Sequence, residues 1–190
     1  MKAAELYRVL DAELGPALRA QGFGKRRSGR LAFQRDAAGK YQTVGFQADK
    51  WGWDPYAGSS FFVNFAVSPS PDPRDPARRD ERLNYFLTEA ELVRAREYRD
   101  ALVARIPPPP ELYFRALEAQ FATAGAEAAR DLVRTVRAQF EPEPQPYRRH
   151  QDFSLRYWTR ADIEGWAAFI RSMLPRAIEE MSSWEVRPNA

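Results

Sequence analysis

The sequence contains no cysteine and a single histidine, His150. Without cysteine the chain can form no disulfide, no thiolate metal site and no cysteine nucleophile. One histidine also excludes a metal site built on two histidines. No stretch approaches the roughly 18 consecutive apolar residues that a membrane-spanning helix needs. We therefore expect no cofactor, no bound metal and no membrane partner.

Charge of one sign is also scarce, because 29 basic residues against 26 acidic residues give a net charge of only +3. Such a balance is not that of a polycation. A chain of 190 residues, 44% of them hydrophobic, can bury a core, so we expect a single domain over residues 1–190. Glu5, Asp11 and Glu13 are not typical of a signal peptide, and we expect a cytoplasmic protein.

What the sequence does contain is a pair of segments in which apolar and polar residues alternate. Residues 41–48 place Val44, Phe46 and Ala48 on one face, and residues 61–67 place four apolar side chains on one face. A further strand is predicted over about residues 30–35, joined to the first by a four- or five-residue loop. Residues 150–158 predict a fourth strand.

Two terminal segments predict amphipathic helices. Residues 2–20 carry a leucine-rich stripe, which Gly15–Pro16 is expected to kink or break. The last helix begins after Thr159, with Asp162 at the capping position, and Pro175 is expected to bend or split it.

The middle of the chain predicts helices bracketed by two proline-rich segments. Residues 81–106 are helical in character, with a capping box that begins at Thr88. Residues 111–140 predict one helix, or a pair that meets near Gly125. We therefore predict an α+β fold: a four-stranded, mostly antiparallel sheet with the N- and C-terminal helices on one face. A helical insertion or subdomain at about residues 72–146 lies between its third and fourth strands.

Two parts of the chain carry a resemblance to a known family. LGPALRAQGFGKRRSGRLAFQRD, VGFQADKW and FFVNFAV are similar to the opening of a bacterial domain of unknown function, number four-three-zero-four. YWTRADIEGWAAFIRSMLP resembles its closing segment. The likeness covers residues 10–67 and 153–175, about half the chain. It implies a fold and no reaction.

The sequence favours a non-enzymatic protein, although it leaves the question of catalysis open. Asp49–Lys50 distantly resembles the acid and lysine of metal-dependent nucleases, but the spacing differs and no partner acid precedes it. A metal-dependent hydrolase is therefore the weakest of three hypotheses. His150 follows two arginines before the fourth strand, which favours a solvated edge residue over a catalytic one.

Basic and aromatic side chains cluster between residues 25 and 56, and they are the predicted binding site. Its members are Arg26, Arg27, Arg30, Lys50, Trp51, Trp53 and Tyr56. Arginine beside exposed aromatics suits single-stranded nucleic acid, which is the alternative hypothesis. Tryptophan, tyrosine and arginine also dominate protein interfaces. The favoured hypothesis is a protein-interaction module of an accessory or toxin-neutralising type.

Overall fold

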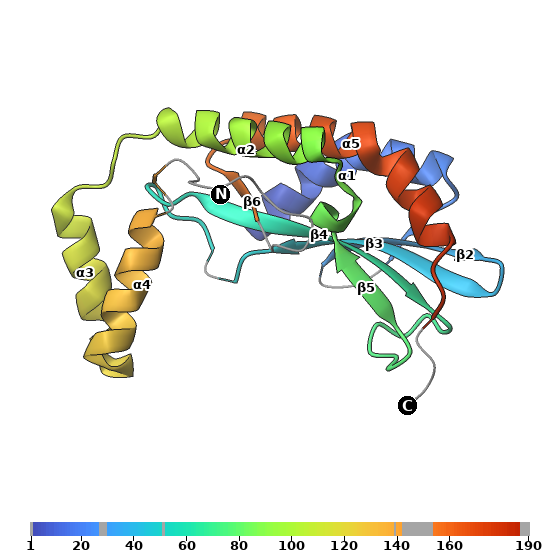
Figure 1. Ribbon diagram of the computed structural model, residues 1–190, viewed down its shortest axis with the longest axis horizontal. Helices are drawn as coiled ribbons and strands as arrows, with labels where there is room; N and C mark the ends of the chain where they lie inside the picture. Colours follow the sequence, from blue (N-terminus) through green and yellow to red (C-terminus); the bar gives the residue numbers. More distant parts are fainter. Residues whose placement is uncertain (1, 27–29, 51, 139, 142–153, 187–190) are drawn as a thin grey trace.

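A computed structural model of the protein describes residues 2–26, 30–50, 52–138, 140–141 and 154–186. In this part of the chain, a six-stranded sheet carries a layer of helices on one face (Figure 1). The strands are β1 (Gly24–Lys25), β2 (Leu31–Ala37), β3 (Lys40–Ala48), β4 (Ser59–Ser68), β5 (Arg79–Arg82) and β6 (Leu155–Tyr157). The helices are α1 (Ala3–Ala20), α2 (Glu89–Ala104), α3 (Glu111–Phe121), α4 (Ala126–Ala138) and α5 (Arg160–Ser182), with short 3-10 helices η1 (Leu83–Phe86) and η2 (Ala122–Ala124).

The strand order is β1-β2-β3-β4-β5, and every pairing is antiparallel. β6 also pairs with β4. Because β3 occupies one edge of β4, both β5 and β6 lie on the other edge, β5 opposite residues 64–67 and β6 opposite residues 59–61. The two short strands are therefore halves of one edge, and the chain between them, residues 83–154, leaves the sheet and returns.

The prediction of an α+β fold with an antiparallel sheet is confirmed, but the sheet has six strands among the described residues and not four. β5 lies inside the segment 72–146 that we expected to be loop and helix. It was missed because its sequence, Arg-Asp-Glu-Arg, has no apolar alternation; charged side chains are typical of edge strands. The helical block accordingly begins at η1, after residue 82, and interrupts an edge of the sheet.

The alternation in the strands separates a core face from an open face. On the core face, the register aligns Leu31 with Phe46 and Val63. A second row aligns Phe33, Val44 and Phe65. All six side chains are at most 3% exposed, which identifies this side of the sheet as the floor of the core.

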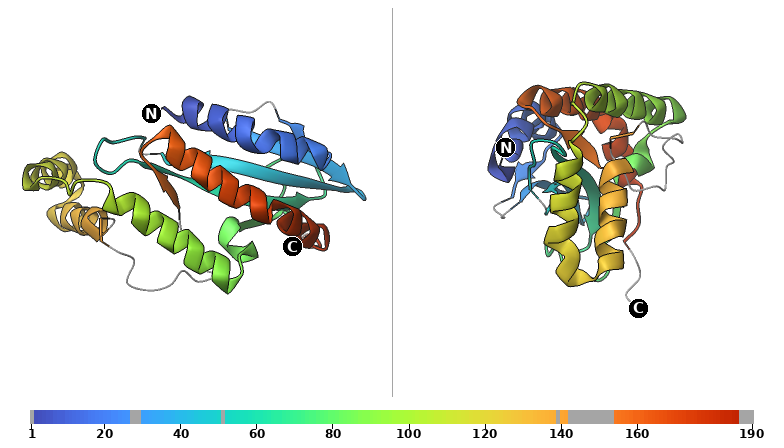
Figure 2. Two further views of the ribbon diagram at one scale, coloured as in Figure 1. Left: turned by 90° about the horizontal axis from the view of Figure 1, so that it is seen from above. Right: turned by 90° about the vertical axis from the view of Figure 1, so that its left-hand side faces the viewer.

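The helical layer covers that floor because α1, α5 and α2 lie side by side across it (Figure 2). α1 contributes a buried stripe at four-residue steps: Leu6, Leu10, Leu14 and Leu18. α5 contributes a longer one: Ile163, Trp166, Ile170, Leu174 and Ile178. Tyr98 of α2 packs edge-on against Trp166, with 4.6 Å between the ring centroids, and so joins α2 to α5.

The predicted capping boxes and the predicted proline breaks have different outcomes. The capping boxes at Thr88 and Thr159 are confirmed. Neither proline splits its helix, since α1 continues through Pro16 and α5 through Pro175. Burial of the helix on both sides of each proline offsets the lost hydrogen bond, because most helix stability in a folded protein comes from tertiary packing.

The β2–β3 connection is tighter than the predicted four- or five-residue loop. It is a two-residue turn in which Ala38 (φ 54°) and Gly39 (φ 74°) both adopt left-handed conformations. Two residues with positive φ match the twist of the strands that they join. Alanine is sterically disfavoured at positive φ, so an alanine at the first turn position is not a signal for such a turn.

α3 and α4 form a helical hairpin, so of the two predicted alternatives, one helix or a pair that meets near Gly125, the pair is confirmed. It projects from the body at one end of the sheet (Figure 1). Few of its side chains are buried: Phe114 in α3, and Ala129 and Val133 in α4. Leu112, at the start of α3, is 76% exposed.

Candidate functional site

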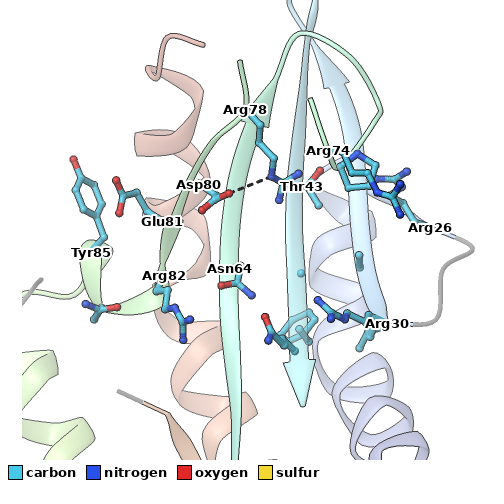
Figure 3. A pocket seen from close by; sticks show the side chains of 17 residues that line it. Arg26, Arg30, Thr43, Asn64, Arg74, Arg78, Asp80, Glu81, Arg82 and Tyr85 are labelled. Atoms are coloured by element: carbon cyan, nitrogen blue, oxygen red, sulfur yellow. Dashed lines mark hydrogen bonds and ion pairs between the residues drawn. The ribbon is translucent and has the colours of Figure 1, made fainter. Parts of the chain in front are cut away.

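The face of the sheet opposite the helices carries a groove with a volume of about 1160 Å³ (Figure 3). Its floor is made by the residues that alternate with the core residues on β2, β3 and β4. They are small or polar: Ala32, Thr43, Gly45, Gln47 and Asn64. Because these strands are already covered on the other face, their outward residues are not required for the core.

Strand register explains how the groove is assembled from distant parts of the sequence. Ala32, Gly45 and Asn64 align directly across three strands. The amide of Arg26 donates to the Ala32 carbonyl (2.8 Å), and Asn64 aligns with Arg82. One row thus crosses five strands with an arginine at each end, separated by four strand spacings of about 4.8 Å each.

The groove is positively charged because arginines dominate its rims. Five of them line it, against two acids: Arg26, Arg30, Arg74, Arg78 and Arg82, with Asp80 and Glu81. In Figure 3, Glu81 points away from the labelled arginines, while Asp80 lies beside Arg78. The Asp80 carboxylate accepts from Nε of Arg78 at 3.4 Å. Five arginines against two acids give the lining of the groove a net charge of +3, which favours a negatively charged ligand.

The guanidinium of Arg82 is held in place by an aromatic ring. It lies over the ring of Phe62, with 3.9 Å between the guanidinium carbon and the ring centroid. This cation–π contact fixes one rim of the groove and covers one face of the Phe62 ring. A base could stack on that ring only after displacing the arginine.

The structure brings only part of the predicted binding site to this groove. Arg26 and Arg30 line it, whereas Trp53 and Tyr56 belong to a loop between β3 and β4 and do not. Lys50 is exposed in the turn after β3. Arg27, Trp51 and His150, on which other sequence expectations depend, lie outside the described residues.

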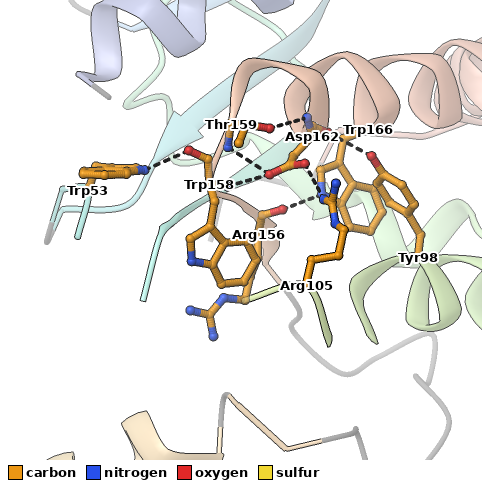
Figure 4. A network of polar contacts seen from close by, with 8 residues as sticks. All are labelled: Trp53, Tyr98, Arg105, Arg156, Trp158, Thr159, Asp162 and Trp166. Atoms are coloured by element: carbon orange, nitrogen blue, oxygen red, sulfur yellow. Dashed lines mark hydrogen bonds and ion pairs between the residues drawn. The ribbon is translucent and has the colours of Figure 1, made fainter. Parts of the chain in front are cut away.

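Trp53 and Tyr56 have partners just after β6 and on α3, not among the arginines of the groove. The indole nitrogen of Trp53 donates to the Trp158 carbonyl (3.2 Å; Figure 4). The Trp158 indole nitrogen donates in turn to the Tyr56 carbonyl (2.7 Å). The Tyr56 ring packs against Tyr113, with 5.1 Å between centroids. These contacts identify the loop as a joint between the sheet and the helical hairpin.

The same joint shifts the acidity of a tyrosine. Burial, followed by the nearby negative charge and hydrogen bond of Asp54, raises the pKa of Tyr113 to about 12. The Asp54 carboxylate also accepts from the amides of Tyr56 (2.8 Å) and Ala57 (2.7 Å). Tyr113 is therefore a neutral hydrogen-bonding group at physiological pH, with no feature of a general base.

Asp162, at the start of α5, accepts several hydrogen bonds in the polar network of Figure 4. Its carboxylate accepts from the amides of Trp158 (2.8 Å) and Thr159 (2.9 Å) and from Arg105 of the α2 terminus (2.6 Å). Burial opposes ionisation of Asp162, but these hydrogen bonds outweigh it and hold the pKa of Asp162 below its usual value. The arrangement joins β6, α2 and α5 and accounts for the acid as a structural group.

A scan of family models, a search of curated proteins and a search of solved structures each returned no match to this chain. The arguments for function consequently rest on the geometry of the groove.

Metal-dependent chemistry receives no support from the described part of the chain. No three histidine, aspartate or glutamate side chains gather there as metal ligands would. Asp49, the acid of the hydrolase hypothesis, accepts a hydrogen bond from the Ser60 hydroxyl (3.2 Å). In addition, no helix among the described residues is both long and apolar enough to cross a membrane.

Sequence reasoning missed three arginines of the groove, Arg74, Arg78 and Arg82. Arg78, Asp80 and Arg82 are two residues apart, and residues at this spacing share one face of a strand. This spacing is the one sequence signal that could have placed the two arginines together. Arg74 comes from the proline-rich loop before β5, and no periodicity predicts where a loop residue points.

Proposed function

We propose that this protein is an interaction module that binds an acidic segment of a partner protein in the arginine-lined groove. The observation that carries the proposal is an open sheet face with five arginines around a floor of small and polar side chains. A module of this kind suits an accessory or toxin-neutralising protein.

The first argument concerns charge. Arg26 and Arg74 both line the groove, where Figure 3 draws them next to one another, and no acid of the described residues forms an ion pair with either. Like charges held near one another repel, and the repulsion is relieved when an anion enters. Several acids elsewhere have an arginine partner: Glu111 pairs with Arg137 (2.7 Å) and Glu164 with Arg160 (2.7 Å).

The second argument concerns the choice between protein and nucleic acid. Single-stranded nucleic acid is bound without sequence preference on platforms of exposed aromatic rings. The floor here offers Thr43, Gly45 and Asn64, while Phe62 lies beneath Arg82. Carboxylates need only hydrogen-bond donors and positive charge, and arginine supplies both. An acidic peptide therefore fits the groove better than a strand of stacked bases.

The third argument concerns dimensions. The arginines at the two ends of the cross-strand row, Arg26 and Arg82, are about 19 Å apart at their Cα atoms, from four strand spacings. A bound peptide in either a helical or an extended conformation is narrower than this, since even an α-helix with side chains measures about 10–12 Å across. Side chains of the segment can thus reach arginines on both rims at once.

Fluorescence anisotropy with labelled peptides tests the proposal. A short poly-glutamate peptide should bind, with an affinity that falls as salt is added, whereas poly-glutamine of equal length should not bind. A deoxythymidine oligonucleotide of equal length should bind more weakly than poly-glutamate. Tighter binding of the oligonucleotide would favour the nucleic-acid alternative and would overturn the proposal.

Two variants locate the binding in the groove. Arg82→Gln removes one rim charge and should weaken poly-glutamate binding about tenfold, the loss of one charge-assisted contact. Gly45→Val leaves every charge in place but fills the floor, and it should weaken binding by a similar factor. Arg8→Gln, an exposed arginine of α1 in the helical layer, is the matched control and should bind as the wild type does. Equal binding by all three variants would exclude the groove.

A further inference from the structure

One end of the groove gathers three arginines around a threonine. Arg26 and Arg74 both line the groove and are drawn next to one another in Figure 3, where Arg78 points toward Thr43 from the opposite rim. They come from separate segments: Arg26 follows β1, while Arg74 and Arg78 belong to the loop between β4 and β5. The remaining groove arginines, Arg30 and Arg82, line its other part.

The loop that carries Arg74 is held by its own acids. The carboxylate of Asp72 accepts from the Arg74 amide (2.9 Å), and that of Asp75 accepts from the Ala77 amide (2.9 Å) and the Ser70 hydroxyl (2.5 Å). These carboxylates are therefore turned to the backbone of the loop and do not pair with the guanidinium of Arg74. The loop is ordered before a ligand arrives, which lowers the entropy cost of binding.

The charge at this end matches that of a doubly charged anion. Among the side chains that line this end, three guanidinium groups and one carboxylate, Asp80, leave an excess of two positive charges, while the carboxylates of Asp72 and Asp75 are not part of the lining. A phosphate monoester carries a charge of about −1.5 to −2 near neutral pH and presents three acceptor oxygens. A single carboxylate carries only one negative charge and has two acceptor oxygens.

Thr43 adds a neutral donor at the centre of the arginines. Its hydroxyl oxygen accepts from the Gln34 side-chain amide (3.1 Å), and the residue is only 6% exposed. With that oxygen engaged as an acceptor, the hydroxyl proton is directed to another group. Arginine forks and a hydroxyl together are the donors that phosphate oxygens take in proteins.

We propose that the Arg26–Arg74–Arg78 end of the groove recognises a phosphoryl group on a side chain of the acidic partner segment. This inference rests on the proposed function, because the rest of the segment would lie along the groove toward Arg30 and Arg82. It makes the partner a phosphorylated protein and the interaction one that phosphorylation controls.

The test uses three labelled peptides that differ at one central position of a poly-glutamate chain: serine, phosphoserine and glutamate. The phosphoserine peptide should bind at least about tenfold more tightly than the other two, from one or two added charge-assisted hydrogen bonds. Arg74→Gln should remove this preference while the serine peptide keeps its affinity within about threefold.

Arg74→Lys sharpens the result because it keeps the charge and removes the planar fork. It should retain binding of the serine peptide and lose part of the preference for phosphoserine, since a point charge cannot make the paired hydrogen bonds of a guanidinium. Arg8→Gln again serves as the matched control. Thermal unfolding of each variant confirms that the fold is retained, which the exposure of Arg74 leads us to expect.

Each outcome decides between the proposals. Equal binding of the three peptides would overturn the phosphoryl inference and leave the acidic-segment function standing. No binding of any peptide would overturn the proposed function itself. A phosphoserine preference that persists in Arg74→Gln would place phosphate recognition elsewhere and would overturn this assignment. A preference lost in Arg74→Gln and kept in Arg8→Gln would support it.

Discussion

The two faces of the sheet are built from the same strands, yet they differ in burial and in the polarity and charge of their side chains. On the core face, the row Leu31, Phe46 and Val63 is closed by helices and is almost fully buried. On the open face, the neighbouring row Ala32, Gly45 and Asn64 forms a groove floor between arginines. The contrast teaches that one set of alternate residues sustains the fold while the other is free to serve binding. Four substitutions test that division, from the largest expected effect to the smallest.

Phe65→Ala should have the largest effect, because it removes a ring from the centre of the core face. Phe65 is 0% exposed and packs against Phe86, with 4.5 Å between ring centroids. Truncation of a buried phenylalanine lowers the free energy of unfolding by about 3–5 kcal/mol. Urea unfolding measures this change. A loss below about 1 kcal/mol, the central value for all point substitutions, would mean that the core is not where the structure places it.

Asp162→Asn tests how the helical layer is fastened over the core face. The variant should lose about 2 kcal/mol, because an amide group cannot accept from both backbone amides and from Arg105 at once. The folded-state pKa of Asp162 is depressed, so its contribution is complete above the unfolded pKa of about 4 and is lost as pH falls through the folded pKa.

Urea unfolding of the wild type and of Asp162→Asn at several pH values below neutral checks that sign. The stability difference between the two proteins should shrink as the solution becomes more acidic than about pH 4. Asp36→Asn, which also replaces one carboxylate by an amide but at an exposed position of β2, is the matched control. A difference that grows in acid would contradict the depressed pKa.

Gly45→Ala should stabilise the protein, in contrast to substitutions on the core face. Gly45 has no positive φ, and a Cβ there would meet only the Asn64 carbonyl at 4.0 Å. Alanine in the interior of a strand is favoured over glycine by about 0.5–1 kcal/mol. The same methyl group raises the groove floor, so peptide affinity should fall as stability rises. Loss of stability would show that the open face is packed more tightly than the groove implies.

Arg74→Gln should change stability least, by at most about 0.5 kcal/mol. The expected direction is a small gain, because the substitution relieves repulsion between Arg74 and Arg26. The gain should be larger at low salt, where charges are screened less. Thermal unfolding at two salt concentrations measures it. A clear loss at low salt would indicate that Arg74 has a stabilising contact in the free protein.

Sequence patterns predicted the core face far better than the open face, for a physical reason. Local alternation of apolar and polar residues predicts the burial of Phe46 and Phe65. Capping residues three positions apart predict the helix starts at Thr88 and Thr159. The groove depends instead on strand register between residues distant in sequence. Nothing local to Arg26 indicates that it shares a row with residue 82.

The aromatic residues of the predicted site also depend on contacts between residues that are distant in the sequence. Trp53 and Tyr56 follow basic residues in the sequence, which favoured a joint binding surface. Their partners are Trp158 and Tyr113, about a hundred and about sixty residues further along the chain, as the spacing in the sequence shows. Since no residue near Trp53 signals such contacts, only coordinates separate this joint from the groove.

The interrupted edge of the sheet has a consequence for how the chain acquires its structure. β5 can pair with β4 as soon as both have been synthesised, but β6 reaches the same neighbour only after residues 83–154 have followed. Closing so long a loop slows the step, although each doubling of its length adds only about 0.6 kcal/mol of entropic cost. We expect residues 59–61 to be the last part of β4 to gain protection from hydrogen exchange during refolding.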